Sequence, residues 1–159
     1  MLRVDIRELQ RGPVRTDGVL QSDDPVLEGL ELGLAGPVSV NGQLQAAGEG
    51  TYLWRGSVHT VVRGECRRCL TEVLDDVDID VDAAVFSTDP EAVDDPDFYP
   101  LPERATAVDV TEVVREELAL AAQTDLLLCR EDCAGLCPQC GADLNAGPCE
   151  CRATPAEPA

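Results

Sequence analysis

Eight cysteines are the residues of this chain whose type and spacing are best suited to chemistry. Six of them lie within residues 129–151, and the other two form the pair Cys66 and Cys69. Two cysteines separated by two residues can bind one tetrahedral ion without straining the backbone. In the segment Cys137-Pro138-Gln139-Cys140, the glycine that follows, Gly141, allows a turn tight enough to aim amide N–H groups at the sulfurs. The spacing therefore predicts metal ligation by thiolates.

The spacings divide the eight cysteines into two sets of four. We predict a first site formed by Cys66, Cys69, Cys129 and Cys133, and a second formed by Cys137, Cys140, Cys149 and Cys151. Another division places Cys129, Cys133, Cys137 and Cys140 in one site and leaves the other cysteines mismatched. In a third arrangement the six C-terminal cysteines bind a single ion, and Cys66 and Cys69 remain reduced thiols.

Zinc is the expected ion, in one or two structural sites, because four thiolates leave no open coordination position. Iron is the alternative, since a similar cysteine knuckle serves rubredoxin-type centres and thiolates discriminate poorly between the two ions. A redox role for Cys66 and Cys69 is disfavoured, because a strand is predicted to follow them where a thioredoxin-like site has a helix.

The composition points away from disulfides and from enzymes. The first residues lack the apolar segment of a signal peptide, and no apolar run is long enough for a membrane anchor. We therefore expect a cytoplasmic protein whose thiols stay reduced. The sequence has a single histidine, His59, which we interpret as a partly exposed strand residue, and it has neither a phosphate-binding loop nor a serine elbow. We expect no enzymatic activity and no small-molecule substrate.

Charge is abundant and unevenly distributed. The chain has 12 basic residues, all of them arginines, and 31 acidic residues, so its formal net charge is −19. Such a charge repels free nucleic acid at long range. Candidate RNA-binding residues gather around the first cysteine pair: Arg55, Arg63, Arg67 and Arg68. Candidate residues for binding a partner through negative charge alternate with apolar residues along one predicted strand: Asp76, Asp78, Asp80 and Asp82.

Hydrophobic periodicity predicts the elements that must position these residues. Apolar and polar residues alternate at residues 30–34, 38–46, 52–62 and 73–85, which predicts four strands joined by glycine-containing turns. This order favours an antiparallel meander, with residues 4–9 as a candidate fifth strand. Helical spacing begins at Asp109.

We therefore expect an α+β fold in which an antiparallel sheet or meander carries one packed helix and a small C-terminal cysteine-rich metal-binding segment. The predicted organisation is an antiparallel β domain at residues 1–86, an acidic proline-rich loop at 87–108, a helix that packs on the sheet at 109–125, a zinc-ribbon-like segment at 126–152 and a disordered tail at 153–159.

Three motifs resemble those of the YceD family, the large ribosomal RNA subunit accumulation proteins. They are Cys66-Arg67-Arg68-Cys69-Leu70, Val114-Arg115-Glu116-Glu117-Leu118, and residues 133–145 with Cys149 and Cys151. The resemblance implies a role in the synthesis, processing or stability of 23S rRNA, and so in assembly of the large ribosomal subunit. It also makes a basic, zinc-ribbon-bearing large-subunit ribosomal protein a candidate partner.

Two mechanisms fit these observations. In the first, the arginines around the first cysteine pair dock the protein on precursor 23S rRNA or on the immature large subunit. In the second, the aspartate row makes the protein an acidic chaperone or escort for a basic ribosomal protein. A third, non-ribosomal alternative is an iron-thiolate electron carrier.

Overall fold

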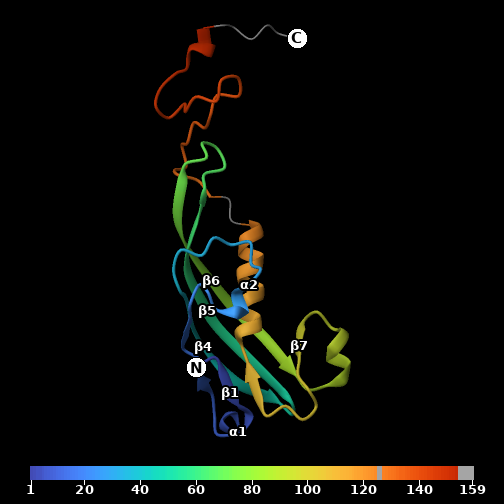
Figure 1. The fold of residues 1–159 in the computed structure, drawn as a ribbon. Coiled ribbons are helices and arrows are strands. Elements are labelled where there is room, and N and C mark those ends of the chain that lie inside the picture. Colours follow the sequence, from blue (N-terminus) through green and yellow to red (C-terminus); the bar gives the residue numbers. More distant parts are fainter. Residues whose placement is uncertain (125–126, 154–159) are drawn as a thin grey trace. The chain divides into compact units, whose positions relative to one another are not determined.

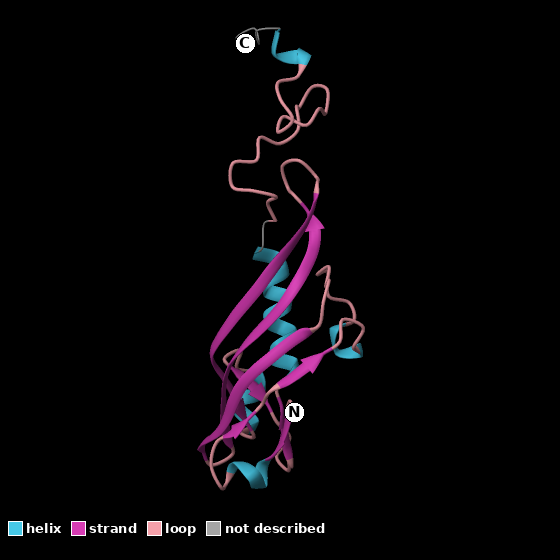
Figure 2. Cartoon of the chain, turned by 90° about the vertical axis from the view of Figure 1, so that its left-hand side faces the viewer, coloured by secondary structure: helices cyan, strands magenta, loops and turns pink. Residues whose placement is uncertain are grey.

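The computed structural model describes residues 1–124 and 127–153, so the expected tail lies, from residue 154 onward, outside the described residues. The chain has an α+β fold with mostly antiparallel strands, which confirms the predicted fold class (Figures 1 and 2). It divides into two compact units. The sheet unit comprises residues 1–62 and 76–124, and the cysteine unit comprises residues 63–75 with the chain from residue 125 onward.

One sheet contains six strands in the order β2-β4-β5-β6-β7, with β3 also paired to β4. Its strands are β2 (Val14–Arg15), β3 (Gly18–Leu20), β4 (Val38–Gly48), β5 (Thr51–Glu65), β6 (Glu72–Ser87) and β7 (Phe98–Pro100). Strands β2, β3 and β5 pair with β4 in antiparallel fashion, whereas β7 runs parallel to β6. A second sheet pairs β1 (Arg3–Asp5) with β8 (Ala107–Asp109) in antiparallel fashion.

Within the described ranges 1–124 and 127–153, the helices are α1 (Ile6–Leu9) and α2 (Thr111–Thr124), and the 3-10 turns are η1 (Pro25–Leu27), η2 (Pro90–Asp94) and η3 (Glu150–Ala153). Helix α2 begins where the Asp109 carboxylate accepts the amide N–H of Thr111 at 3.0 Å. Its buried residues Val113, Val114 and Leu118 join the core of the sheet unit. No helix among residues 1–124 and 127–153 is long and apolar enough to cross a membrane.

The core of the sheet unit is built around Trp54, which is fully buried. Its indole lies against a glycine pair, Gly42 and Gly56, which face each other across β4 and β5. A Cβ atom added at either glycine would come within 2.6 Å of the Trp54 ring. The indole N–H donates a hydrogen bond of 2.7 Å to the hydroxyl of buried Thr16. The two glycines thus make the space that the largest core side chain requires.

Two predicted strands are wrong. Residues 30–34 form no strand, and their ladder contact is an isolated bridge between Leu34 and Val62. The alternating leucines pack against the core, but Gly29 has a φ of +79° and the segment runs as a loop. Residues 4–9 do not extend the meander, because the Asp5 carboxylate accepts the Arg7 amide N–H and starts the short helix α1.

The proline-rich stretch at residues 87–108 contains more regular structure than the predicted loop. Asp89 caps the turn η2 with its carboxylate, and Pro90 occupies the first position of that turn. Strand β7 then pairs with the end of β6, with Val85 opposite Phe98, and β8 pairs with β1. These pairings place aromatic and acidic side chains beside the start of α2.

Candidate metal centres

The structure brings the eight cysteines together in two groups of four, and within each group all sulfur atoms lie within 4.8 Å of one another. The groups are the two sets favoured by the spacing. Cluster one is Cys66, Cys69, Cys129 and Cys133, and cluster two is Cys137, Cys140, Cys149 and Cys151. Cluster one lies wholly within the cysteine unit, where it joins the turn between β5 and β6 to the C-terminal segment.

The sulfur spacing of cluster one fits tetrahedral zinc. Four sulfurs bound 2.3 Å from one ion lie about 3.8 Å apart in a regular tetrahedron. The sulfurs of Cys66 and Cys133 are 3.8 Å apart, and those of Cys69 and Cys129 are 3.6 Å apart. All eight cysteines are free thiols. Four sulfur ligands with no open coordination position suit a structural ion. Such an ion would cross-link the segments of chain that carry the cysteines.

Each cluster contains one cysteine knuckle, formed by residues 66–70 in cluster one and by residues 137–141 in cluster two. The two knuckles have the same pattern of backbone hydrogen bonds. The amide of Leu70 donates to the Cys66 carbonyl at 2.8 Å, and the amide of Gly141 donates to the Cys137 carbonyl at the same distance. The backbone N–H of Cys66 donates to the Thr71 carbonyl at 2.8 Å, and that of Cys137 donates to the Ala142 carbonyl at 2.8 Å. The residue after the second cysteine is left-handed in both, with φ of +61° at Leu70 and +74° at Gly141.

Backbone amides stabilise a thiolate at the first cysteine of each knuckle. Hydrogen bonds from backbone amides, led by that of Cys129, lower the pKa of Cys66 to about 6. The amides of Cys140 and Gln139 likewise lower the pKa of Cys137 to about 6. By contrast, the pKa of Cys151 rises to about 12, because of its hydrogen bond with the Cys140 sulfur, its burial and the nearby thiolate charges. Four thiolates this close together require a cation to neutralise their repulsion.

Leu70 occupies the knuckle position that glycine fills in cluster two. We therefore predict that a substitution to glycine at this position stabilises the protein. A left-handed backbone costs a residue with a Cβ atom about 1 kcal/mol or more. Leu70→Gly should therefore raise the free energy of unfolding of the zinc-loaded cysteine unit by about 1 kcal/mol, measured by denaturant titration. Leu74, which is as exposed as Leu70 at 58%, lies in strand β6. Leu74→Gly is the matched control and should destabilise the protein. Destabilisation by both substitutions would contradict the strain at Leu70.

Asn145 supports cluster one from outside, and sequence reasoning missed it. Its side-chain amide donates to the Cys133 sulfur at 3.4 Å. Its carbonyl oxygen accepts from the Ala134 amide at 2.8 Å and from the Arg130 guanidinium at 2.7 Å. The hydrogen bond from Asn145 is the largest cause of the lowered pKa of Cys133, and the Gly135 amide contributes to it. The one available signal was the position of Asn145 between the two cysteine-rich stretches of cluster two.

Asn145→Ala should weaken zinc binding at cluster one by about tenfold or more, because partners outside the ligand shell hold the ligands in place. Competition with a chromophoric chelator measures this loss. Asn41→Ala is a matched control, since Asn41 is the chain's other asparagine and lies exposed on β4. Equal zinc retention in the two variants would show that Asn145 does not act on the cluster.

The four candidate RNA-binding arginines are all exposed, but they differ in what they contact. Arg55 lies on β5 in the sheet unit, whereas the other three lie in the cysteine unit. The Arg63 guanidinium lies 3.6 Å from the Glu72 carboxylate. Arg68 donates to the carbonyls of Glu131 at 3.2 Å and Cys133 at 3.1 Å. Arg67 forms no ion pair within the described part of the chain, so its guanidinium faces solvent.

The aspartate row lies on β6 as the alternation predicted. Asp76, Asp78, Asp80 and Asp82 are exposed, while Val77 and Val81 between them are buried. His59 lies on β5 next to this row, and its Nδ1 atom is 2.7 Å from the Asp78 carboxylate. Its Nε2 atom is 3.8 Å from Asp76. His59 is thus a strand residue that pairs with the aspartates, and it lies in neither cysteine cluster.

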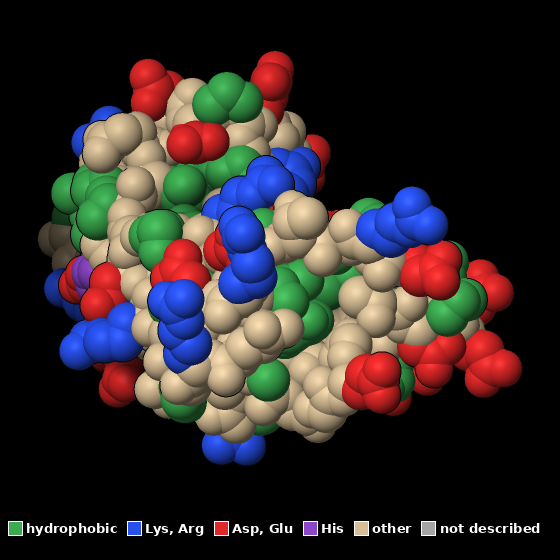
Figure 3. All heavy atoms as spheres, turned by 90° about the horizontal axis from the view of Figure 1, so that it is seen from below, with side chains coloured by type: hydrophobic (Ala, Val, Ile, Leu, Met, Phe, Trp, Pro, Cys, Tyr) green, Lys and Arg blue, Asp and Glu red, His purple; other side chains and the backbone are tan. Residues whose placement is uncertain are grey.

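Further carboxylates gather where η2 and β7 project from the sheet unit (Figure 3). Glu91, Asp94 and Asp97 are exposed there, and Asp95 is half-buried. The sequence indicated an acidic loop at this place but not the aromatic strand β7 beside it.

Comparison with known proteins gives one match. A family model described as "Large ribosomal RNA subunit accumulation protein YceD" matches residues 54–159, which is more than half of the chain. The matched region contains every cysteine of both clusters, helix α2 and the aspartate row. No curated protein and no solved structure matches the chain.

Proposed function

The chain belongs to the YceD family, and from this membership we propose that it is a non-enzymatic cytoplasmic factor that supports accumulation of 23S rRNA. We infer that it acts during assembly of the large ribosomal subunit, by docking on precursor rRNA or on the immature subunit. In this proposal the two cysteine clusters each hold a structural zinc ion, and no reaction takes place at the metal.

The observation that carries the docking proposal is the turn formed by residues 66–71. Cluster one, together with the hydrogen bond from the Arg67 amide to the Leu127 carbonyl at 3.0 Å, fixes the backbone of this turn. A fixed backbone lowers the entropy cost of binding, and the planar guanidinium of Arg67 can bind a phosphate through two N–H groups. Arg67 is therefore the first phosphate-binding candidate. Arg63, on β5 just before the turn, is the second, because its pairing with Glu72 is exposed and long at 3.6 Å. Arg68 instead maintains the turn by its bonds to carbonyls.

Replacing Arg63 and Arg67 together by alanine should weaken co-sedimentation with large-subunit precursors about tenfold at physiological salt, because two phosphate contacts are lost. The same variant should fail to restore 23S rRNA levels in cells that lack the protein. Zinc content should not change, since neither side chain contacts a sulfur. A control variant, Arg11→Ala with Arg104→Ala, removes two exposed arginines of the sheet unit. Docking by the turn is refuted if both double variants behave alike.

The exposed aspartate row supports the second candidate function, an acidic escort for a basic large-subunit ribosomal protein. Association between such opposite charges is fast and sensitive to salt. Changing Asp76, Asp78, Asp80 and Asp82 to asparagine should abolish capture of that protein if the escort function holds, and should spare co-sedimentation if docking holds. The escort function is refuted if capture persists in this variant.

A further inference from the structure

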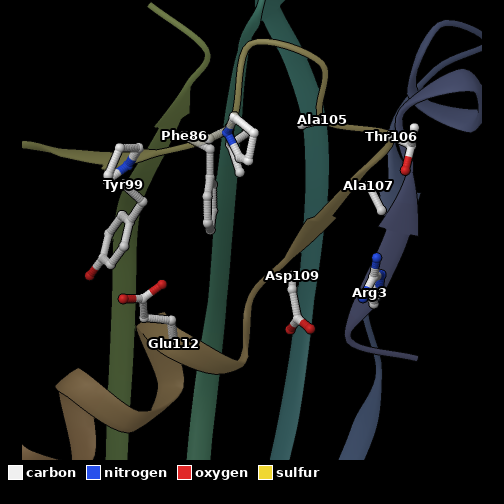
Figure 4. A pocket seen from close by; sticks show the side chains of 11 residues that line it. Arg3, Phe86, Tyr99, Ala105, Thr106, Ala107, Asp109 and Glu112 are labelled. Atoms are coloured by element: carbon white, nitrogen blue, oxygen red, sulfur yellow. The ribbon is translucent and has the colours of Figure 1, made fainter. Parts of the chain in front are cut away.

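Two pockets adjoin each other in the sheet unit and share Tyr99, Pro100 and Glu112. Their volumes are about 270 and 410 Å³. Figure 4 shows the smaller pocket, where Tyr99 from β7, Phe86 from β6 and Glu112 from the start of α2 line one hollow. We call the two pockets together the Tyr99 groove. Because the pockets adjoin, the groove is long enough for an extended segment of chain and not merely a single side chain.

The walls of the Tyr99 groove combine aromatic and apolar side chains with polar ones. Phe98 and Tyr99 are half-buried, so part of each residue remains accessible to solvent, and Val93 is 62% exposed. The Tyr99 ring is supported from behind by Phe86, with ring centroids 5.2 Å apart. The Tyr99 hydroxyl donates a hydrogen bond of 2.7 Å to Glu116 on α2. The aromatic wall is thus held rigidly in place.

The larger pocket is lined by four carboxylates and by no basic side chain. The four are Asp94, Asp95, Glu112 and Glu116. None of them forms an ion pair with any residue within 1–124 or 127–153. Burial raises the pKa of Tyr99, and so do its hydrogen bond to Glu116 and the charges of neighbouring glutamates. The smaller pocket adds the Asp109 carboxylate and one basic side chain, Arg3, so five carboxylates in the whole groove face a single arginine. The groove therefore carries a net negative charge.

We propose that the Tyr99 groove binds an extended, arginine-bearing segment of a basic protein partner. A guanidinium can lie against the accessible part of Phe98 or Tyr99 while donating to the carboxylates that line the groove. The apolar residues Val93 and Pro96 of the larger pocket can contact the aliphatic stem of the arginine side chain. A nucleic acid is the wrong ligand here, because its phosphates would meet four carboxylates.

The groove is separate from both surfaces invoked above, since it includes neither the arginines of the turn nor the aspartate row. The inference rests on the proposed function in one respect: it expects a basic protein partner to be present during ribosome assembly. Arginine-peptide binding is measured with purified protein, whereas the proposed function is measured by 23S rRNA levels. Failure of one therefore leaves the other standing.

The experiment titrates the full chain into a fluorescent nine-residue peptide that carries three arginines separated by glycine and proline. Fluorescence anisotropy at physiological salt reports binding. The groove variant carries Asp94→Asn, Asp95→Asn and Glu112→Gln. The matched control carries Asp23→Asn, Glu28→Gln and Glu49→Gln, which removes the same number of charges from exposed positions of the same unit that belong neither to the groove nor to the aspartate row. We expect the groove variant to bind about tenfold more weakly or worse, and the control to bind within about twofold of the unchanged protein.

A second arm uses the unchanged protein and does not depend on the folding of any variant. Replacing each arginine of the peptide by citrulline keeps its shape and removes its charge, so binding should be lost. Separately from this arm, the variant Phe98→Leu should weaken binding several-fold by removing an aromatic ring from the groove. Equal weakening in the groove and control variants would show binding by overall charge and overturn the proposal. So would undiminished binding of the citrulline peptide, or a structured rRNA fragment that displaces the arginine peptide from the groove.

Discussion

Replacing Cys66 with serine should leave the purified protein with one tightly bound metal ion in place of two, and should detach the C-terminal segment from the turn at residues 66–71. Cys66 is fully buried, and its sulfur lies 3.8 Å from that of Cys133. A structural zinc site contributes about 10 to 16 kcal/mol of apparent binding free energy. Losing one of four thiolates removes most of that contribution, so cluster one should not retain zinc under purification conditions.

The rest of the molecule should survive this substitution, because its stability has other sources. The core of the sheet unit contains no cysteine. Cluster two closes within the C-terminal segment and needs no residue from the turn. Metal analysis gives the stoichiometry, and amide hydrogen exchange reports which segment has opened. Cys149→Ser is the matched comparison: it should also leave one ion but keep the turn protected. If Cys66→Ser retains two ions and a protected turn, cluster one is not a metal site.

Trp54→Ala should destabilise the sheet unit by about 3 to 5 kcal/mol, which is a large part of the stability of an ordinary domain. The indole is fully buried, and the neighbouring glycines at positions 42 and 56 leave a cavity that no other side chain can fill when it is removed. The hydroxyl of buried Thr16 would also lose its hydrogen-bond partner.

Denaturant unfolding followed by far-ultraviolet circular dichroism measures this loss, since the substitution removes the chain's one tryptophan fluorophore. Trp54→Phe is the graded control. It keeps most of the apolar volume but still leaves the Thr16 hydroxyl without its hydrogen-bond partner. The loss of unfolding free energy should therefore be smaller than for Trp54→Ala, and it should fall further when Thr16→Val is added. A loss below about 1 kcal/mol for Trp54→Ala would mean that the glycine pair does not build the core around this residue.

The pairing of the two cysteines within each knuckle could be predicted because it depends on local geometry. A knuckle sets two sulfurs by its own backbone turn, and Cys66 and Cys137 make the same hydrogen bonds despite their different surroundings. The buried and exposed faces of β6 followed from alternation for a similar reason, since Val77 and Asp78 must point to opposite sides of a strand.

The errors have a common physical origin in tertiary contacts. Leu30, Leu32 and Leu34 alternate as a strand would, yet they reach the core from a loop, because alternation reports burial and not ladder pairing. The roles of Arg68 and Asn145 were hidden because their partners are backbone carbonyls and a sulfur brought close by the fold. The Tyr99 groove was hidden because β7 is three residues long and is defined by its pairing with β6.

The charge distribution explains how an acidic member of this family could still work on ribosomal RNA or on proteins that bind it. Within residues 63–75 arginines and carboxylates are equal in number, at three each, so this turn is not repelled from phosphate as the whole chain would be. Other carboxylates are concentrated in the sheet unit, along β6 and in the larger pocket of the Tyr99 groove. Separate surfaces can therefore meet RNA and a basic protein.

The most direct test of this account is the metal content of the full chain purified without added metal. We predict two equivalents of zinc per chain and a colourless protein, because both clusters offer four thiolates in a closed tetrahedral arrangement. Visible absorption with bound iron would favour the electron-carrier alternative. One equivalent or none, in protein whose eight thiols are reduced, would contradict the account.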